Sequence, residues 1–247
     1  SRGAIGAALA GLALLLALQP TRAGARATVT VLAAAGLASL ATVALPGVQD
    51  VDGSPGQGAA MLAILAVLSV AAFFATRADA TPIPRLRPLA TVALVALLAG
   101  TVLAVAISGS QGPAASTAAD RLVSVQSNRY AYWRVAVDVF AEHPLRGVGS
   151  SAFAVEWLQR REIAEAVRDA HSLYLETAAE LGLVGLLALA ALIAGIVGAA
   201  RRRHAPPAVV AALAAFALHA GLDWDWELPA LGLTAVLLAA RLLADAE

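Results

Sequence analysis

Residues 128–185 read NRYAYWRVAVDVFAEHPLRGVGSSAFAVEWLQRREIAEAVRDAHSLYLETAAELGLVG, and this stretch decides how the rest of the chain is understood. It holds most of the strongly polar and aromatic side chains, whereas the sequence on both sides is almost entirely Ala, Leu, Val and Gly. A chain that is apolar nearly everywhere and polar in one block is typical of a membrane protein with one sizeable aqueous segment. We therefore expect this stretch to form an active-site loop that faces away from the cytoplasm.

The overall composition also indicates a membrane protein. Hydrophobic residues make up 60% of the 247 residues, charged residues make up 14%, and the mean hydropathy is +0.78. Soluble domains average roughly 45–50% apolar and about 25% charged residues. The formal net charge is zero, which gives no bulk attraction to nucleic acid. The absence of cysteine excludes disulfides and thiolate metal sites.

The apolar sequence divides into runs that are long enough to be membrane helices. A helix crosses about 30 Å of hydrocarbon with roughly 20 apolar residues, and Pro20 and Pro46 end the first two runs. We predict an all-α integral membrane fold with about seven transmembrane helices and one large extracytoplasmic helical loop. The predicted spans are residues 3–19, 28–45, 59–76, 88–108, 173–200, 208–222 and 228–243. Residues 1–108 thus hold the first four helices, residues 109–172 the loop, and residues 173–247 the remaining helices.

Arginine in the short loops predicts the orientation in the membrane. Arginines lie between the first and second runs, the third and fourth, and the fifth and sixth, and these loops share a side if each run spans once. The alternate connections carry most of the acidic residues. The prediction is a multi-pass protein of the cytoplasmic membrane with the long loop outside the cytoplasm. The arginines concerned are Arg22, Arg26, Arg77, Arg85, Arg87, Arg201, Arg202 and Arg203.

The spacing of apolar residues predicts two amphipathic helices within the loop. Residues 120–142 form the first, which would lie along the membrane interface, and residues 150–168 form the second. Asp169 is expected to cap the following helix, with His171 in its first turn. The HPLRGVG turn, residues 143–149, is expected to bring the polar residues of the loop together.

Arginines of the loop are candidates for binding phosphate. A guanidinium binds phosphate through paired, charge-assisted hydrogen bonds, and a cation in a membrane protein is costly unless it is paired or faces water. Arg129 and Arg134 lie in a Tyr- and Trp-rich helix, and Arg2 falls on the same side of the membrane. Arg2 and Arg129 are therefore candidates to converge on a diphosphate. The alternative is that these are interfacial arginines whose charged ends reach water.

Among the histidines, His171 is the candidate general base. An imidazole titrates near neutral pH and can take a proton from a hydroxyl, although a helix-terminal histidine with a satisfied hydrogen bond is the alternative. His143, which precedes a proline, and His204, which lies in the arginine-rich loop, are interpreted as structural. His219 lies in a predicted span, four residues before Asp223. They are expected to satisfy one another, but an ionisable residue inside a membrane is also a functional candidate.

Other chemistries have weaker signals in the sequence. There is no HxxxH or HExxH motif, no P-loop and no Gly-x-Ser-x-Gly elbow, so metal ligation is poorly supported. Trp224 and Trp226 alternate with carboxylates, which suits either sugar stacking or an aromatic belt at the membrane surface, and we favour the belt. Glu176 and Glu180 share one helix face, where a paired-carboxylate hydrolase is possible but a solvated or Arg-paired face is more common.

Several short motifs, taken together, resemble those of one family. They are SRGA at residues 1–4, RYAYW at 129–133, HPLRGVG at 143–149, AHSLYLE at 170–176, ELGLVG at 180–185 and HAGLDWDWELP at 219–229. Their order and spacing resemble the O-antigen ligase and polymerase family over essentially the whole chain, which corresponds to the C-terminal half of that family. The start, Ser1-Arg2-Gly3, has no Met and no signal-peptide pattern. We therefore expect the family's N-terminal helices to be missing here, and they would help to shape the lipid groove.

The resemblance implies both a fold and a reaction. Members of the family are all-helical, GT-C-like membrane glycosyltransferases that use an undecaprenyl-diphosphate-linked glycan as donor and need no nucleotide sugar, metal or other cofactor. By position, Arg2 and Arg129 match arginines that bind the diphosphate. His171 matches the histidine that activates the acceptor hydroxyl for inverting attack at the anomeric carbon. The residues expected to support the site are Arg134, Trp133, Tyr174, Glu176, His219 and Asp223.

The expected role is polysaccharide biosynthesis for the cell envelope. Ligase and polymerase activity are both compatible with the sequence, and the acceptor hydroxyl can belong to a lipid, a glycan or a protein. A polyprenyl-lipid transporter or flippase is an alternative function, but it would have polar or broken spans near the middle of the bilayer, and the first four predicted spans are unbroken and nonpolar. A non-catalytic membrane subunit is a third alternative, which the concentration of Arg, His and Trp in one loop disfavours.

Overall fold

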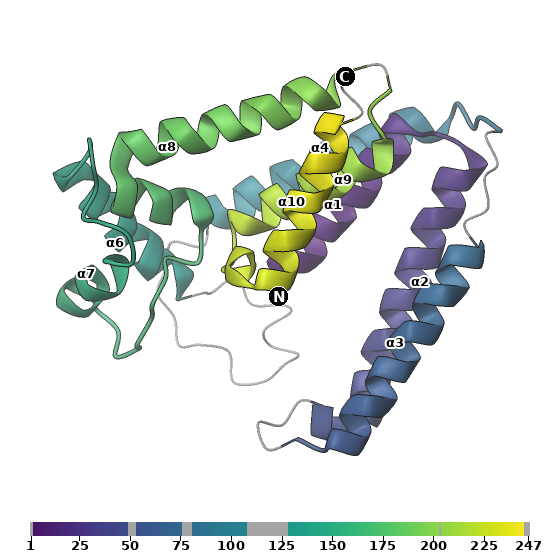
Figure 1. Cartoon of the computed structure of the whole chain (residues 1–247), viewed down its shortest axis with the longest axis horizontal. Helices are drawn as coiled ribbons and strands as arrows, with labels where there is room; N and C mark the ends of the chain where they lie inside the picture. The colour runs from purple at the N-terminus through teal and green to yellow at the C-terminus, as the bar shows by residue number, and fades with distance from the viewer. Residues whose placement is uncertain (1, 49–52, 76–80, 108–127, 203, 245–247) are drawn as a thin grey trace. The chain divides into compact units, whose positions relative to one another are not determined.

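The computed structural model of the chain describes residues 2–48, 53–75, 81–107, 128–202 and 204–244 (Figure 1). These residues form helices and no strand, which confirms the predicted all-α class. The α-helices are α1 (Arg2–Leu18), α2 (Arg22–Ala44), α3 (Pro55–Ala75), α4 (Leu86–Ile107), α6 (Arg129–Glu142), α7 (Phe153–Arg160), α8 (Leu173–Ala200), α9 (Pro207–Ala220) and α10 (Pro229–Ala244). Two short 3-10 helices are η1 (Pro46–Val48) and η2 (Asp225–Glu227).

Each predicted apolar run forms a helix. Within the described residues, four of these helices, α2, α3, α4 and α8, are long and apolar enough to cross a membrane. Their side chains face outward: Phe73 is 76% exposed and Val43 is 75% exposed, which would be unfavourable in water and is compatible with lipid. Helices α1, α9 and α10 are shorter apolar helices, so the total of about seven spans stays a prediction.

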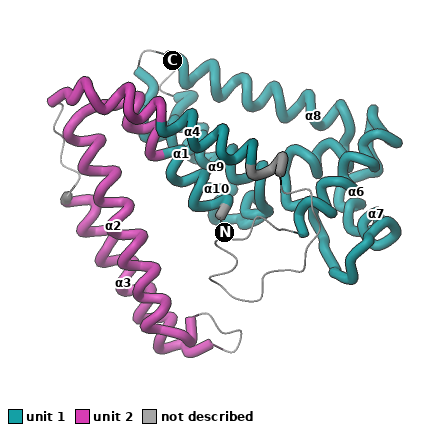
Figure 2. Tube along the Cα trace, turned by 180° about the vertical axis from the view of Figure 1, so that it is seen from behind, with its two compact units in different colours: residues 1–11, 93–247 teal, residues 12–92 magenta. Residues whose placement is uncertain are grey.

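The chain forms two compact units, which Figure 2 shows in different colours. The smaller unit is Leu12–Val92, in which α2 and α3 lie side by side as a hairpin. Gln57, at the start of α3, accepts a hydrogen bond of 2.8 Å from the backbone N–H of Gly47 and closes the turn between them. At the other end, Thr21 caps α2 and forms an isolated bridge with Pro82 before α4. This cap explains why α2 begins at Arg22, whereas the predicted apolar run begins at residue 28.

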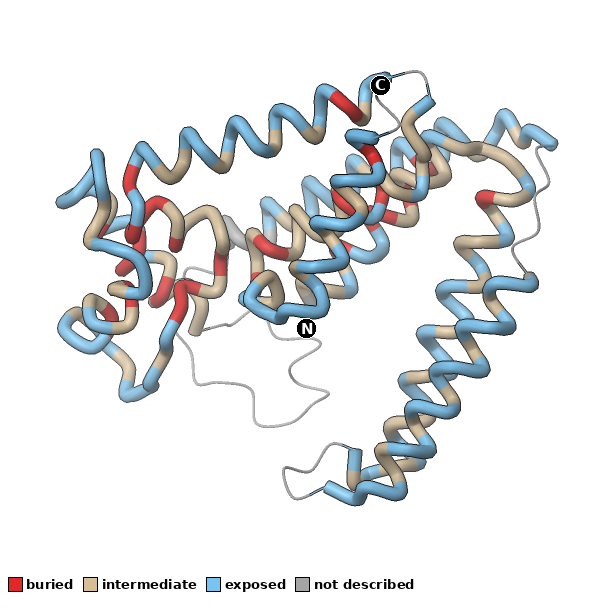
Figure 3. The backbone as a smooth tube through the Cα atoms, viewed as in Figure 1, coloured by how far each residue is buried: buried red, intermediate tan, exposed pale blue. Residues whose placement is uncertain are grey.

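The larger unit, Ser1–Gly11 with Ala93–Glu247, contains two apolar clusters. The first cluster is formed by α6, α7 and the first turns of α8, where Phe153 and Trp157 are both 0% exposed. The buried segments in Figure 3 are concentrated there. The second cluster lies between α8, α9 and α10. We call residues 128–182, which surround the first cluster, the polar module.

Helix α6 corresponds to the first predicted loop helix. Tyr132, Val135, Ala136 and Val139 recur at helical spacing, and all four are buried against α7 and α8. The beginning of the predicted helix, residues 120–127, lies outside the described residues. The sequence predicted this helix but not its buried face. The expected apolar stripe ran through Tyr130, Trp133, Val137 and Phe140, and Val137 is 51% exposed.

The second loop helix is shorter than predicted. Helix α7 ends at Arg160, whereas the apolar pattern extends to residue 168. After α7 the chain returns over Trp157, whose indole N–H donates to the backbone carbonyl of Glu165 at 2.8 Å, while Ile163 packs against the first cluster. This return is favoured over a longer helix because it buries the indole and pairs its N–H, and an unpaired buried donor costs free energy.

Helix α8 is broken at Gly182, where φ is 61° and ψ is −153°. In a regular α-helix the N–H groups of Leu183 and Val184 would donate to the carbonyls four residues earlier, at Ala179 and Glu180. The break frees all four of these backbone groups. Such groups must find other partners when they are buried.

The HPLRGVG turn satisfies the four groups that the break in α8 frees. Two of its carbonyls accept the freed N–H groups, and two of its N–H groups donate to the freed carbonyls. The pairs are Leu183 with Pro144 at 2.8 Å, Val184 with Leu145 at 3.3 Å, Val148 with Ala179 at 3.0 Å and Gly149 with Glu180 at 2.8 Å. The turn after α6 and the break in α8 therefore form a single joint.

This joint needs glycine on both sides. Gly147 has a φ of +63° and Gly182 has a φ of +61°, in the region that glycine adopts without steric cost. A Cβ at Gly147 would lie 2.3 Å from the backbone of Glu180, and a Cβ at Gly182 would lie 2.6 Å from the backbone of Arg146. Side chains at these two positions would push the turn away from α8.

Candidate functional site

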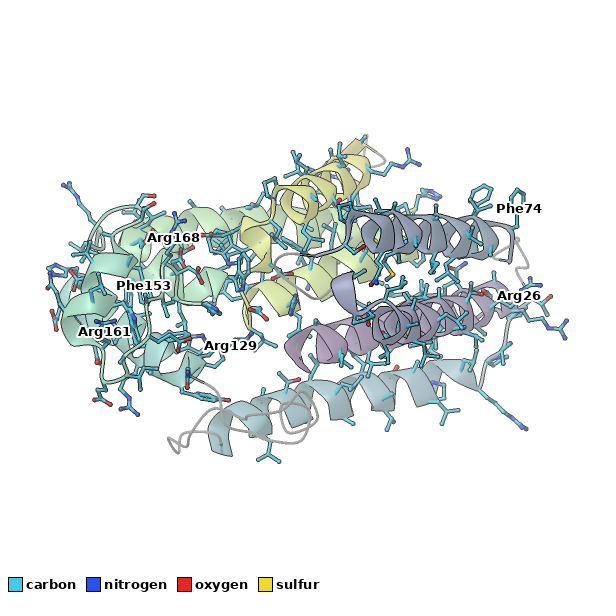
Figure 4. All side chains as sticks on the ribbon, turned by 90° about the horizontal axis from the view of Figure 1, so that it is seen from below. Arg26, Phe74, Arg129, Phe153, Arg161 and Arg168 are labelled. Carbon is cyan, nitrogen blue, oxygen red and sulfur yellow. The ribbon has the colours of Figure 1, made fainter. Side chains whose placement is uncertain are left out.

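Three segments that are far apart in the sequence meet at one edge of the polar module: the first turn of α6, the turn before α8, and the connection between α9 and α10. Arg129 begins α6, and its Nη2 lies 2.6 Å from Oδ2 of Asp223, which follows α9. The side chain of Asp223 is 8% exposed and that of Arg129 is 28% exposed, so the pair is largely removed from water. Figure 4 labels Arg129 at the start of α6. Arg2, predicted to converge with Arg129, begins α1, and its side chain lies outside the described residues.

The turn before α8 is organised by a second acidic pair. Nδ1 of His171 lies 2.6 Å from Oδ1 of Asp169, and the backbone N–H of His171 donates to the same oxygen at 3.1 Å. The prediction for this turn was wrong: Ser172 caps α8 by accepting the Leu175 N–H at 3.5 Å, and His171 precedes the helix. The carboxylate of Asp169 does not cap the helix because it is held by His171.

Burial and Asp169 act in opposite directions on His171. Burial lowers the pKa of the imidazole, but the hydrogen bond and the negative charge of Asp169 outweigh it, so the pKa of His171 is raised above its ordinary 6.5. The positive charge of Arg129 opposes this rise. The two side chains that the sequence predicts to carry the chemistry, Arg129 and His171, therefore lie within electrostatic range of one another.

Two aromatic rings flank His171. The ring of Tyr132 lies 5.2 Å from the imidazole between centroids, and the ring of Trp224 lies 6.5 Å away. Burial, together with a 2.6 Å hydrogen bond from its hydroxyl to Glu165, raises the pKa of Tyr132, so it stays a neutral phenol. Trp224 is 42% exposed, and its backbone N–H donates to Oδ1 of Asp223 at 3.1 Å. The imidazole thus has one buried ring and one exposed ring near it.

His219 has a closer acidic partner than the predicted one. Its Nδ1 lies 2.6 Å from Oδ2 of Asp225, whereas its Nε2 lies 3.8 Å from Oδ2 of Asp223, too long for a hydrogen bond. Helix η2 turns the chain back after α9 and brings Asp225 next to the ring. His219 and Asp225 thereby fix the turn that presents Asp223 to Arg129.

Glu176 and Glu180 do not form the solvated or Arg-paired face that the sequence predicted. Both are buried, with 7% exposure each. Glu176 accepts a hydrogen bond from the backbone N–H of Ala170 at 2.8 Å. Glu180 accepts hydrogen bonds from the N–H groups of Ser151 at 2.8 Å and Phe153 at 3.0 Å. The two carboxylates therefore fix the loops on either side of α7, because each pairs buried backbone donors.

The remaining predicted supporting residues differ in their surroundings. The hydroxyl of Tyr174 donates to the carbonyl of Ala217 at 2.7 Å and ties α8 to α9. Trp133 packs against the first cluster, and its buried Nε1 has no hydrogen-bond partner among the described residues. The side chain of Arg134 is 54% exposed and lies 3.7 Å from Glu162. Arg134 thus lies on an exposed face of the polar module.

Four acidic partners were missed by reasoning from the sequence: Asp169 of His171, Glu165 of Tyr132, Asp225 of His219 and Asp223 of Arg129. The spacing of Asp169 and His171 contained a usable signal, because an aspartate commonly bonds the backbone N–H two residues later. The bond between Glu165 and Tyr132 joins residues 33 positions apart, and no local pattern indicates it. The pairing of Asp225 depends on the η2 turn, which the alternation of acidic and aromatic residues does not specify.

In the part of the chain that the structure describes, long apolar helices face outward, and the polar module holds an arginine and a histidine that are each paired with aspartate. These features define an integral membrane protein with a concentrated polar site. The model of the O-antigen ligase family matches residues 55–190, more than half of the chain, and the chain therefore belongs to that family. The matched segment includes Arg129, Asp169, His171 and Gly182. Members of the family are membrane glycosyltransferases that act as ligases or polymerases. Neither the curated proteins nor the solved structures contain a match to the chain.

Proposed function

We propose that this protein transfers a glycan from undecaprenyl diphosphate to an acceptor hydroxyl at the outer face of the cytoplasmic membrane. The observation that carries the proposal is that Arg129, paired with Asp223, and His171, paired with Asp169, meet in one site: the ring of Trp224, the residue after Asp223, lies 6.5 Å from the imidazole. Arg129 and His171 both lie inside the segment that matches the family. Family membership supports a lipid-linked glycan as the substrate and a membrane location. The transfer inverts the configuration of the anomeric carbon.

Arg129 binds the diphosphate of the donor in this proposal, together with Arg2. A guanidinium carries five N–H donors, so contact of Nη2 with Asp223 is compatible with binding of phosphate by the same group. As the bond between the anomeric carbon and the diphosphate breaks, its electron pair moves to the departing phosphate oxygen. The guanidinium stabilises this developing negative charge, which supports a reaction that requires no metal ion. Asp223 fixes the position of Arg129.

His171 acts as the general base in this proposal. The acceptor oxygen attacks the anomeric carbon, and its proton passes to the imidazole, which later releases it to water. Tyr132 and Trp224 flank the imidazole and limit the directions from which a hydroxyl can approach. A raised pKa makes the imidazole a stronger base, but it also keeps more of it protonated below neutral pH. The transfer rate is therefore expected to fall in acid.

The arrangement in the membrane belongs to the same proposal. The fold is GT-C-like, with about seven transmembrane helices. Residues 109–172 lie outside the cytoplasm, between the helices of residues 1–108 and those of residues 173–247. Helices α1, α9 and α10 have 17, 14 and 16 residues, fewer than the roughly 20 of an average span. A bilayer accommodates short spans by local thinning. The arginine-containing loops would lie in the cytoplasm.

Substitution of the two central residues tests the proposal. His171→Ala and Arg129→Ala in the full-length protein are expected to lower glycan transfer at least about 100-fold, because one loses proton transfer and the other loses stabilisation of the leaving group. Arg129→Lys keeps the charge without the planar fork and is expected to retain partial activity. Mass spectrometry of the glycan product, made in a strain that lacks the gene, gives the measurement. Membrane fractionation shows whether each variant is inserted.

Matched controls separate these roles from general damage. His204→Ala and Arg146→Ala remove exposed side chains of the same types and are expected to retain full transfer. Full activity of either His171→Ala or Arg129→Ala would refute the proposal. Movement of the polyprenyl lipid between the leaflets of vesicles, without formation of glycosidic bonds, would instead support the flippase function.

A further inference from the structure

We propose that Asp169 is a positioning residue that holds His171 by Nδ1 and directs Nε2 toward the acceptor hydroxyl. The inference rests on the proposed function, since it concerns the base of that reaction. Its structural part, the tautomer of His171, can be measured without any substrate. The positioning role of Asp169 and the proposed function can therefore succeed or fail separately.

One carboxylate oxygen of Asp169 holds His171 at two points. Oδ1 lies 2.6 Å from Nδ1 of the ring and accepts the backbone N–H of His171 at 3.1 Å. An ionised carboxylate only accepts hydrogen bonds, so Nδ1 must carry the hydrogen. In a neutral imidazole Nε2 then has the lone pair and is the nitrogen that can take a proton.

The backbone of the turn fixes the direction of the ring. His171 has a φ of +52°, which is uncommon for a residue that carries a side chain. Asp169 is 8% exposed, and the adjacent Ala170 is 0% exposed with its N–H bonded to Glu176. The turn is therefore held in place by the burial of Asp169 and Ala170 and by the hydrogen bond to Glu176. The orientation of the imidazole follows from this turn as well as from rotation of its own side chain.

Other charged groups near His171 act at longer range. Arg129 faces it from α6, and Glu227 faces it from η2. Among the described charged groups, Asp169 is the one in hydrogen-bond contact with the ring. The chemistry of the ring nitrogens is therefore set by Asp169, whereas the other groups change the strength of the base.

The proposed step leaves the proton on Nδ1 in place. The acceptor hydroxyl gives its proton to Nε2 while its oxygen forms the bond to the anomeric carbon and the bond to the diphosphate breaks. The imidazolium that results carries protons on both nitrogens. Asp169 stabilises that positive charge and accepts no proton, as the buried aspartate does in a Ser-His-Asp triad. It touches neither donor nor acceptor and acts only through His171.

Nuclear magnetic resonance of the full-length protein, labelled with ¹⁵N-histidine in detergent micelles, tests the structural part. The chain has four histidines, and His171→Gln identifies the signal of interest. We expect wild-type His171 to carry its hydrogen on Nδ1 when neutral. Asp169→Ala is expected to shift the ring toward the Nε2–H form. Asp169→Asn keeps an oxygen that accepts from Nδ1–H, so it is expected to keep the tautomer and titrate at lower pH.

The pH dependence of transfer tests the functional part. In Asp169→Asn the acidic limb of the pH–rate profile is expected to move to lower pH, because the negative charge that favours imidazolium is lost. In Asp169→Ala the rate is expected to fall at least about tenfold with unchanged KM for the donor, because Arg129 is not altered. Asp138→Asn removes an exposed carboxylate from α6 and is the matched control, with no change expected in either experiment.

The outcomes distinguish this inference from the proposed function. If His171→Ala is inactive but Asp169→Ala keeps the wild-type tautomer, titration and rate, the positioning role is refuted and the proposed function stands. If His171→Ala is fully active, the proposed function is refuted, and a tautomer change in Asp169→Ala would show a structural pair only. Should Asp169→Ala fail to fold, an unchanged titration and pH–rate profile in Asp169→Asn would still refute the role.

Discussion

The polar site consists of acid–base pairs rather than of isolated side chains. Burial of a charge is costly unless it is paired, and removing one member of a buried pair is more damaging than the pair itself is stabilising. Among the described residues, three nitrogen-bearing side chains of the site accordingly each have their own carboxylate. The pairs are Arg129 with Asp223, His171 with Asp169 and His219 with Asp225. Variants of the aspartates are therefore as informative as variants of their partners.

The raised pKa of His171 predicts a pH-dependent stability. Because the pKa in the folded protein is above the ordinary 6.5, the pair with Asp169 contributes its full stability below that value and loses it as pH rises through the folded pKa. The gap in unfolding temperature between wild type and His171→Gln is therefore expected to be larger at about pH 6 than at about pH 9. Thermal unfolding in detergent measures it, and a gap that widens toward alkaline pH would contradict the prediction.

At the scale of helices, the joint between the HPLRGVG turn and the break in α8 organises the polar module. Hydropathy treats residues 173–200 as one uninterrupted run, and the bounds of α8 agree with it. The break could not be inferred from Gly182 alone, because several other glycines occupy apolar helices without breaking them. Its cause is tertiary: the freed backbone groups are paired only when residues 144–149 are in place.

Alanine substitutions test this joint. Gly182→Ala and Gly147→Ala are each expected to lower the free energy of unfolding by about 2 kcal/mol or more, because a positive φ and a backbone clash act together. Gly195→Ala, in α8 but with open space around its Cβ, is the matched control and is expected to change stability by no more than about 1 kcal/mol. Denaturant unfolding followed by tryptophan fluorescence measures the effect, since Trp157 is fully buried. If Gly182→Ala were as stable as the wild type, the requirement for glycine in this joint would be contradicted.

At the scale of the whole molecule, the orientation in the membrane is the property that function most depends on. A donor at the outer face can be used only if the polar module lies outside the cytoplasm. The distribution of arginines among the short loops predicts this side. The exposed apolar side chains of α2, α3, α4 and α8 support insertion but do not distinguish the two orientations.

Labelling of single cysteines tests the orientation without interference, because the natural chain has no cysteine. Ser54→Cys and Glu162→Cys are expected to react with a membrane-impermeant maleimide applied to the outside of the cytoplasmic membrane. His204→Cys, in an arginine-containing loop, is expected to react only after permeabilisation. These side chains are exposed, so failure to react reports the side of the membrane rather than burial. Labelling of His204→Cys from outside would reverse the proposed topology.

The sequence by itself determined the features that depend on local composition. Apolar runs have to leave water wherever they occur, so hydropathy identified every run that became a helix, and turn motifs together with Arg129 and His171 indicated the family. The early end of α7 at Arg160 was not predictable in this way, because it depends on where Trp157 finds a partner for its indole N–H. A local apolar pattern carries no information about that partner.

Only the tertiary structure decided which polar groups pair. Arg129 and Asp223 are 94 positions apart, and their contact exists because packing brings the start of α6 to the turn after α9. Even the neighbours Asp169 and His171 were assigned wrongly, since Ser172 was equally able to cap α8 and the fold determined which side chain did so. Helix formation follows from the transfer of each segment out of water. The pairing of charges follows from which buried groups the completed fold leaves within reach of one another.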